Sequence, residues 1–351
     1  MSRPQIAPPV TQPSRMTGTT HSEGGDASWP FFIVGCGRSG TTLLRTLLNR
    51  HPACAIPLES LFITDYLRVS RHLPLAQLLP MMVREPEIAE WGLRARVDDL
   101  ADCDSVSQAI DRLHSLYAHQ HGKRRWGQKT PRFIRQMELL GTAFPWARFV
   151  HIIRDPRAVV NSLKHSDVHH SNALYGAKRW RADVGRGLSY ARLVPERVLE
   201  LRFETLVRDT EQALTEVCRF LELAWPGPAW WDLGGQATDE YSAFYDEIHK
   251  NLDRSISGEH IDKWTSQLSE REVEVVEDTT LEFMVKLGYE PQFENPSPSP
   301  MFVTALRAER LAGIVRQLVK YLRQRRRYLL FLFYRKLRLG LLTDFLRAAN
   351  Y

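Results

Sequence analysis

Residues 31–42 read Phe-Phe-Ile-Val-Gly-Cys-Gly-Arg-Ser-Gly-Thr-Thr, an apolar run followed by a loop rich in glycine and hydroxyl groups. The run Phe31–Val34 is short and ends in glycine, which predicts a buried strand. Beyond the loop, leucines recur at helical spacing as far as Leu48, and His51-Pro52 predicts the end of that helix. A strand, a glycine-rich turn and a helix in this order are typical of the beginning of a β-α-β unit.

The loop between strand and helix has the composition of an anion-binding site. Glycines allow the backbone to curl so that its N–H groups point inward, and the N-terminus of the following helix favours negative charge. The hydroxyl groups add further donors. The candidate ligands of the anion are Gly37, Arg38, Ser39, Gly40, Thr41 and Thr42.

The loop departs from the phosphate loop of nucleotide triphosphatases, G-x-x-x-x-G-K-[ST], at one informative position. Gly35, Gly40 and Thr42 fit that pattern, but Thr41 stands where the pattern has lysine, and the cation lies inside the loop at Arg38. The lysine normally reaches the outer phosphates beside a magnesium ion. The sequence therefore predicts a phosphorylated ligand other than ATP with magnesium.

Two further strands are expected at Phe149–Ile153 and Val198–Phe203, each followed by a helical stretch, to Leu163 in the first case and over residues 208–221 in the second. Residues 61–120 and 170–195 have helical patterns. Strands that alternate with helices predict an α/β fold with a central, mainly parallel sheet of the P-loop type, flanked by helices.

Composition divides the chain into four parts. Residues 1–29, rich in Pro, Ser, Thr and Gly, predict a disordered leader; residues 30–292 form the main domain; residues 293–300 form a Pro-rich linker. Residues 301–351 predict a basic amphipathic helical tail, with twelve Lys or Arg against Glu309 and Asp344. The chain has a net charge of +6, so the part before the tail is slightly acidic.

A cytoplasmic location is the simplest expectation for this chain. No signal peptide or span-length apolar run is visible, and the four widely spaced cysteines suit a reducing compartment. The tail is compatible with contact to a membrane surface, to a partner or to a second copy of the chain. No basic stripe with interleaved aromatic residues lies in the main domain, so nucleic-acid binding is not expected.

Three separated segments resemble the sulfotransferases that use 3'-phosphoadenosine 5'-phosphosulfate (PAPS). Residues 38–42, Arg-Ser-Gly-Thr-Thr, look like the 5'-phosphosulfate loop of that family. Residues 154–162, Arg-Asp-Pro-Arg-Ala-Val-Val-Asn-Ser, look like its 3'-phosphate segment, and residues 202–207, Arg-Phe-Glu-Thr-Leu-Val, are close to its R-Y-E-D-L-V element. The likeness runs from about Phe31 to Pro291, and within the superfamily residues 51–60 are most similar to the tyrosylprotein branch and its bacterial relatives.

The resemblance implies transfer of a sulfuryl group from PAPS to a hydroxyl or amine of an acceptor, without a metal. It implies that Arg154 and Ser162 bind the 3'-phosphate and that Phe203 contacts the adenine. It places the catalytic base at Glu59 within Pro57-Leu58-Glu59-Ser60. Two lysines complete the expectation: Lys129 in Gly-Gln-Lys-Thr-Pro (127–131) beside the sulfate, with Arg38 also catalytic, and Lys263 before Trp264 on the nucleotide.

Departures from the family pattern leave the acceptor open. Ser166 stands where the tyrosylprotein branch has a further arginine, and the late transition-state serine of that branch has no clear counterpart. Carbohydrate, lipid, peptide and small natural product all stay candidates for the acceptor.

The alternatives to a sulfotransferase are a P-loop kinase and a non-catalytic nucleotide-binding protein at a membrane surface. The histidine cluster His165, His169 and His170 lacks a carboxylate or cysteine to complete a recognisable metal site.

Overall fold

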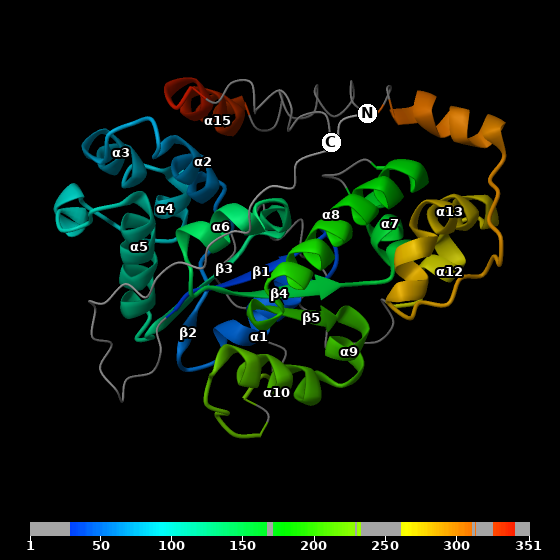
Figure 1. The fold of residues 1–351 in the computed structure, drawn as a ribbon, viewed down its shortest axis with the longest axis horizontal. Helices are drawn as coiled ribbons and strands as arrows, with labels where there is room; N and C mark the ends of the chain where they lie inside the picture. Colours follow the sequence, from blue (N-terminus) through cyan, green and yellow to red (C-terminus); the bar gives the residue numbers. More distant parts are fainter. Residues whose placement is uncertain are drawn as a thin grey trace, which may run out of the picture.

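The computed structural model describes residues 29–166, 171–228, 230–232, 261–310, 313 and 326–340. Its centre is a five-stranded parallel sheet in the order β2-β3-β1-β4-β5 (Figure 1). The strands are β1 (Phe31–Gly35), β2 (Cys54–Ala55), β3 (Arg125–Lys129), β4 (Arg148–Ile153) and β5 (Val198–Arg202). The predicted α/β fold with a central parallel sheet is confirmed.

Helices cover both faces of the sheet (Figure 1). In the first half of the chain they are α1 (Thr41–Asn49), α2 (Phe62–Val69), α3 (Leu75–Met82), α4 (Pro86–Glu90), α5 (Val106–Gln120) and α6 (Met137–Ala143), with short 3₁₀ segments at Val97–Leu100 and Pro131–Arg135. Then follow α7 (Pro156–Lys164), α8 (Ala173–Leu193), a 3₁₀ turn at Pro195–Arg197, α9 (Phe203–Arg208), α10 (Thr210–Leu221), α12 (Trp264–Gln267), α13 (Glu270–Lys286) and α15 (Arg326–Arg338).

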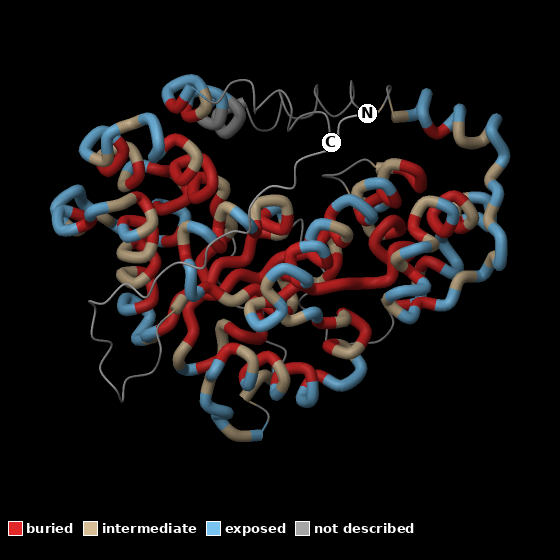
Figure 2. Tube along the Cα trace, in the orientation of Figure 1, coloured by how far each residue is buried: buried red, intermediate tan, exposed pale blue. Residues whose placement is uncertain are grey.

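The alternation of side chains along β1 divides the core between the two faces. Phe32 and Val34 pack into a cluster with residues of α2, α5 and α6, whereas Phe31 and Ile33 pack against α1 and α10. All five residues of β1 are buried, because a strand covered on both faces has no solvated side. Figure 2 shows the buried residues concentrated along the sheet and the inner faces of its helices.

Strand β3 was not predicted from the sequence. Its residues, Arg-Trp-Gly-Gln-Lys, have no apolar run or alternation, yet all five are buried. Gly127 lies opposite Phe31 in the register, and a Cβ atom on Gly127 would lie 2.4 Å from the ring of Phe31. The strand therefore depends on a glycine to accommodate the large ring of its neighbour.

One predicted boundary is wrong by a single residue. Phe203 was expected to end a strand, but β5 ends at Arg202 and Phe203 is the first residue of α9. Asp209 then caps α10 by accepting a hydrogen bond of 3.1 Å from the backbone N–H of Gln212. Two helices, α9 and α10, therefore begin within eight residues of the end of β5.

The segment after the main sheet runs through a proline-rich stretch into helical residues 300–310, and α15 follows later. The helix α15 lies near α2 and α3 (Figure 1). The leader predicted for residues 1–29 lies almost wholly outside the described residues, as do most residues of the tail between 311 and 325. The predicted four-part division stays a prediction.

Candidate functional site

The motifs singled out in the sequence follow the carboxyl ends of neighbouring parallel strands. The glycine-rich loop follows β1, Thr130 follows β3, Arg154 follows β4 and Phe203 follows β5. Because these strands are parallel and adjacent, their carboxyl ends meet at one edge of the sheet. This edge is the usual binding position in open α/β sheets.

The glycine-rich loop has the backbone geometry of a curled anion site. Arg38 has a φ angle of 74° and Gly40 one of 93°, both in the left-handed region. The backbone N–H of Ser39 donates a hydrogen bond of 3.1 Å to the carbonyl of Cys36. Arg38 occupies a conformation that non-glycine residues adopt rarely, and such conformations concentrate at binding sites.

Arg38 and Arg154 lie together, 116 residues apart in sequence, and Ser162 joins them. The Nε atom of Arg38 donates a hydrogen bond of 3.0 Å to the Oγ atom of Ser162. The Nη1 atom of Arg154 donates a hydrogen bond of 3.1 Å to the backbone carbonyl of Arg38. The loop after β1, the end of β4 and the helix α7 therefore meet at one point.

The electrostatics of this point favour an anion. Burial lowers the pKa of Arg38, and burial lowers the pKa of Arg154 to about 10, with a further lowering effect from Arg38 and an opposing one from Glu204. Two desolvated guanidinium groups side by side are destabilised in their charged form. The Oγ atom of Ser39 is buried with no hydrogen-bond partner in the described part of the chain. The donors present fit a phosphate group.

Phe203 links the loop to the end of β5. Its ring lies under the guanidinium of Arg154, with 4.3 Å from the guanidinium carbon to the ring centroid. A Cβ atom on Gly40 would lie 2.2 Å from Cδ2 of the same ring. The phenyl ring thus holds Arg154 from one side and requires glycine at position 40 on the other.

Glu59, Lys129 and Thr42 form a second polar group beside the loop. The Nζ atom of Lys129 lies 2.5 Å from Oε1 of Glu59 and 3.2 Å from Oγ1 of Thr42. The side chain of Lys129 is 2% exposed and that of Glu59 is 32% exposed. The carboxylate is therefore reachable from solvent, while the ammonium group is enclosed behind it.

Buried donors hold the segment that carries Glu59. The Nε atom of Arg45 donates hydrogen bonds of 3.0 Å to the carbonyls of Ile56 and Pro57. Leu58 accepts hydrogen bonds of 3.2 Å from Trp91 and 3.1 Å from Gln128. These contacts to α1, β3 and the region after α4 fix the backbone on both sides of the carboxylate, so its position does not depend on a flexible loop.

Lys263 lies on a different segment from this group, at the start of α12. Lys263 precedes α12, and no hydrogen bond or ion pair of its side chain with the predicted site residues is found in the described ranges. Trp264 is buried, packs with Ala158 and Leu268, and lies 4.1 Å from the guanidinium carbon of Arg157. Its environment is that of a core residue with one edge on a pocket.

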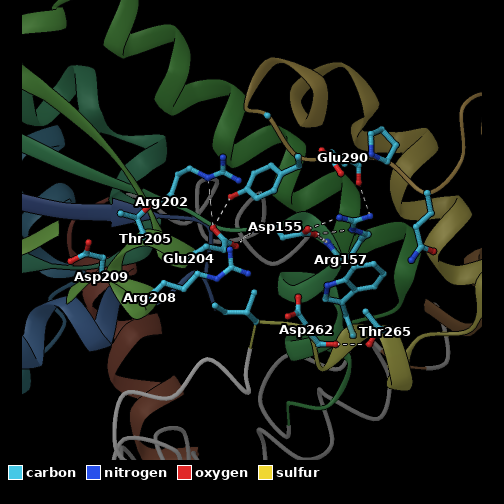
Figure 3. Close-up of a pocket in the computed structure, with 16 residues that line it drawn as sticks. Asp155, Arg157, Arg202, Glu204, Thr205, Arg208, Asp209, Asp262, Thr265 and Glu290 are labelled. Carbon is cyan, nitrogen blue, oxygen red and sulfur yellow. Dashed lines mark hydrogen bonds and ion pairs between the residues drawn. The ribbon is translucent and has the colours of Figure 1, made fainter. Parts of the chain in front are cut away.

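That pocket has a volume of about 780 Å³ (Figure 3). Its lining includes Asp155, Arg202, Glu204 and Trp264, but none of the residues of the glycine-rich loop. In Figure 3 the side chains of Arg202 and Glu204 point toward one another, and Asp155 pairs with Arg157. Because its lining contains both arginines and carboxylates, the pocket shows no preference for a ligand of one charge.

Sequence reasoning missed a group of three residues behind the glycine-rich loop. A Cβ atom on Gly37 would lie 2.8 Å from Nη2 of Arg179, so this arginine of α8 touches the back of the loop. Asp183, one turn further along α8, lies 3.7 Å from Arg179 and 2.6 Å from Arg135. The pattern of α8 gives no sign of this contact, because it depends on where the helix crosses the sheet.

The described residues contain no cluster of three or more His, Cys, Asp or Glu arranged for a metal ion. His165 bonds to the carbonyl of Asn161, whereas His169 and His170 lie outside the described residues. None of the described helices is long and apolar enough to cross a membrane.

Fold and site together are those of an α/β protein that binds a phosphorylated ligand, with an anion loop after the first strand and a second arginine at the neighbouring strand end. A model of the sulfotransferase family matches residues 30–227. The chain belongs to this family, and it is a PAPS-dependent sulfotransferase.

Relatives of this chain include proteins from animals and bacteria. It is 24% identical over 284 residues to protein-tyrosine sulfotransferase 1 of Danio rerio, which covers 77% of this chain and 76% of the relative. It is 26% identical over 294 residues to nodulation protein NoeE of Sinorhizobium fredii, which covers 75% and 67%. The fold is similar to the sulfotransferase domain from the curacin biosynthetic pathway, with a TM-score of 0.54 and 20% identity over 76% of this chain and 99% of that one.

Proposed function

We propose that this enzyme transfers the sulfuryl group of PAPS to a hydroxyl or amine of its acceptor by in-line displacement, with Glu59 as the base. The observation that carries the proposal is the arrangement of two charged groups around the glycine-rich loop. Arg38, Arg154 and Ser162 form one group, and Glu59 with Lys129 forms the other.

The first group binds the nucleotide. The second group acts in the transfer step, together with Arg38. Arg154 and Ser162 hold the 3'-phosphate. We retain Phe203 as an adenine contact on the family resemblance. When bound, PAPS supplies the sulfuryl group and a phosphate leaving group. The loop residues Gly37, Ser39, Gly40, Thr41 and Thr42 bind the 5'-phosphosulfate. We retain Lys263 as a nucleotide contact on the family resemblance alone.

The transfer step needs a base and a stabilised leaving group. Glu59 takes the proton of the acceptor as the acceptor attacks. Lys129 and Arg38 offset the negative charge that builds on the departing phosphate, and their contacts with Glu59 and Ser162 beside the loop support this role. The mechanism needs no metal ion, since fixed cations supply the charge.

The rival reading of a P-loop kinase is weakened by Thr41, which stands where a kinase of this class has its lysine. A non-catalytic nucleotide-binding role is weakened by the ion pair of Glu59 with the enclosed Lys129. The Glu59 carboxylate is 32% exposed although it is paired with Lys129, so it can reach the hydroxyl of an acceptor as a general base must.

The relatives that bear tyrosylprotein names support an acceptor hydroxyl. The free, buried state of Cys36, Cys54, Cys103 and Cys218 supports a cytoplasmic location.

A calorimetric titration with 3',5'-ADP tests the nucleotide assignment, and a transfer assay with labelled PAPS and a panel of hydroxyl acceptors tests the reaction. We expect 3',5'-ADP to bind without magnesium and more tightly than ATP with magnesium. Binding of ATP with magnesium but not of 3',5'-ADP would support the kinase instead.

A further inference from the structure

The helix α15 packs on the enzyme through charged residues. The side chain of Arg335 is 2% exposed, and its Nη1 atom donates hydrogen bonds of 2.9 Å to Glu85 and 2.8 Å to Glu87. Lys336 forms an ion pair with Asp65 of α2. On this side of α15, Arg335 and Lys336 meet an acidic cluster formed by Asp65, Glu85 and Glu87. Leu339, just beyond the helix, packs into the hydrophobic core beside them.

The opposite face of α15 is apolar and exposed. Leu330, Phe333, Tyr334 and Leu337 follow the spacing i, i+3, i+4 and i+7, which places them on one side of the helix. Each of the four is between 38% and 58% exposed. We call these four residues the outer stripe. Figure 2 shows exposed residues on α15 at the rim of the molecule.

In ordinary helix packing an apolar stripe faces the core, whereas the outer stripe of α15 faces solvent. The ion pairs with the acidic cluster fix the rotation of the helix about its axis. They hold the outer stripe away from the body of the enzyme, where water surrounds it. A row of apolar side chains held outward in this way is typical of an interaction surface.

The charge of the tail indicates which partner this surface fits. Residues 301–351 contain twelve Lys or Arg, of which ten remain besides Arg335 and Lys336, and two acidic residues, Glu309 and Asp344. Two such tails would repel one another, which disfavours a second copy of the chain as the partner. An apolar stripe within a basic segment matches an anionic lipid surface, because the lipid chains take the apolar residues and the headgroups attract the cations.

We propose that α15 rests on the surface of an anionic lipid bilayer through the outer stripe, while the ion pairs of Arg335 and Lys336 hold the enzyme to the helix. The enzyme is then bound at the bilayer surface. The proposal is independent of the acceptor and of the catalytic role of Glu59.

Vesicle flotation of the full chain tests the proposal. One set of vesicles contains phosphatidylcholine alone, and the other contains phosphatidylcholine mixed with phosphatidylglycerol. The test variant is the double substitution Phe333→Ser with Leu337→Ser. The control is Trp146→Ser, because Trp146 is 71% exposed and lies on the segment between α6 and β4.

We expect the natural chain and the Trp146→Ser variant to float with the anionic vesicles, and the double variant to partition about tenfold more weakly. Added salt weakens the binding, since the attraction of the cations is screened. Unchanged 3',5'-ADP affinity of the double variant checks that it is folded.

Three results would overturn the proposal: no flotation of the natural chain, equal flotation of the double variant, or equal binding to neutral vesicles. A dimer in sedimentation that the double variant converts to a monomer, without vesicle binding, would assign the outer stripe to a second copy.

Discussion

The carboxylate of Glu59 and the ammonium group of Lys129 lie 2.5 Å apart, although 70 residues separate them in sequence. The ammonium group is enclosed and also contacts Thr42 of the glycine-rich loop. One ion pair therefore connects the proposed base to the proposed phosphosulfate site. Proton removal and stabilisation of the leaving group are thus assigned to side chains in direct contact.

Replacing Glu59 with glutamine removes the base with little change in shape. We expect kcat to fall about a thousandfold, because general-base catalysis of this kind contributes on that order, and 3',5'-ADP affinity to stay close to that of the natural enzyme. Steady-state kinetics and calorimetry measure the two quantities. Glu138→Gln on α6, an exposed carboxylate, is the matched control. Full turnover of the Glu59→Gln protein would remove Glu59 from its role.

Replacing Arg154 with lysine keeps the charge but loses the planar fork that can grip a phosphate. We expect 3',5'-ADP to bind about tenfold more weakly, as when a hydrogen bond to a charged group is lost. Binding of 5'-AMP, which lacks the 3'-phosphate, changes little. The ratio of the dissociation constants of 5'-AMP and 3',5'-ADP measures the contribution of the 3'-phosphate to binding. Arg112→Lys, at an exposed ion pair with Asp102, serves as control. An unchanged ratio would show that Arg154 contacts another part of the nucleotide.

Replacing Gly40 with alanine strains the loop in two ways. The φ angle of 93° is unfavourable for alanine, and the new methyl group meets the ring of Phe203. The control is Gly122→Ala, since Gly122 has a φ of 67° with nothing within 4 Å of its Cβ position. We expect the control to lower the free energy of unfolding by about 1 kcal/mol and Gly40→Ala to lower it by about 2 kcal/mol more.

The clash also predicts a rescue. Phe203→Leu destabilises the natural protein but restores part of the stability lost in Gly40→Ala, because the smaller side chain leaves room for the methyl group. Denaturant unfolding of the four proteins gives the coupling free energy. Strict additivity of the two substitutions would contradict a direct contact between positions 40 and 203.

The acidic cluster predicts a pH dependence of stability. Burial raises the pKa of Glu85 from 4.5 to about 7; Arg335 acts in the opposite direction and Glu87 in the same one. Tyr66 donates a hydrogen bond of 2.7 Å to this carboxylate. Between pH 4.5 and about 7 the folded chain holds a proton on Glu85 that the unfolded chain has released.

Stability from this group is therefore complete below pH 4.5 and is lost as the pH rises to about 7, by up to about 3 kcal/mol. We expect the free energy of unfolding of Glu85→Gln, measured with denaturant, to change less with pH over this range than that of the natural chain. Glu90→Gln, an exposed carboxylate on α4, leaves this pH dependence unchanged. If the free energy of unfolding of Glu85→Gln changed with pH as steeply as that of the natural chain, the raised pKa of Glu85 would be refuted as the cause.

The sequence predicted the parts of the fold that local patterns determine. β1 is an apolar run, β4 is largely apolar, and β5 has Val198, Leu199 and Leu201 around a single glutamate. The loop after β1 has its own glycine pattern, so the edge of the sheet with Arg38 and Arg154 followed from strand order. β3 did not, because Arg-Trp-Gly-Gln-Lys has no apolar period and is buried only by its neighbours. Lys129 was found instead through the family resemblance.

Contacts made by helix crossings were beyond sequence reasoning. Arg179 reaches the back of the loop only because α8 crosses the sheet at that point, and Arg335 meets Glu85 across 250 residues. Such pairs depend on tertiary packing and have no local signature. The resemblance supplied Lys263 as well, and its contact with the nucleotide stays a prediction.

The contact between Gly40 and Phe203 has a consequence for how this enzyme can diverge from its relatives. The two positions belong to segments 163 residues apart, yet a bulkier residue at one requires a smaller one at the other. Relatives with a different residue at position 203 are thus expected to differ at position 40 as well. Substitutions at the two positions should be correlated. An alignment deep enough to compare them would record this history without any measurement on the protein itself.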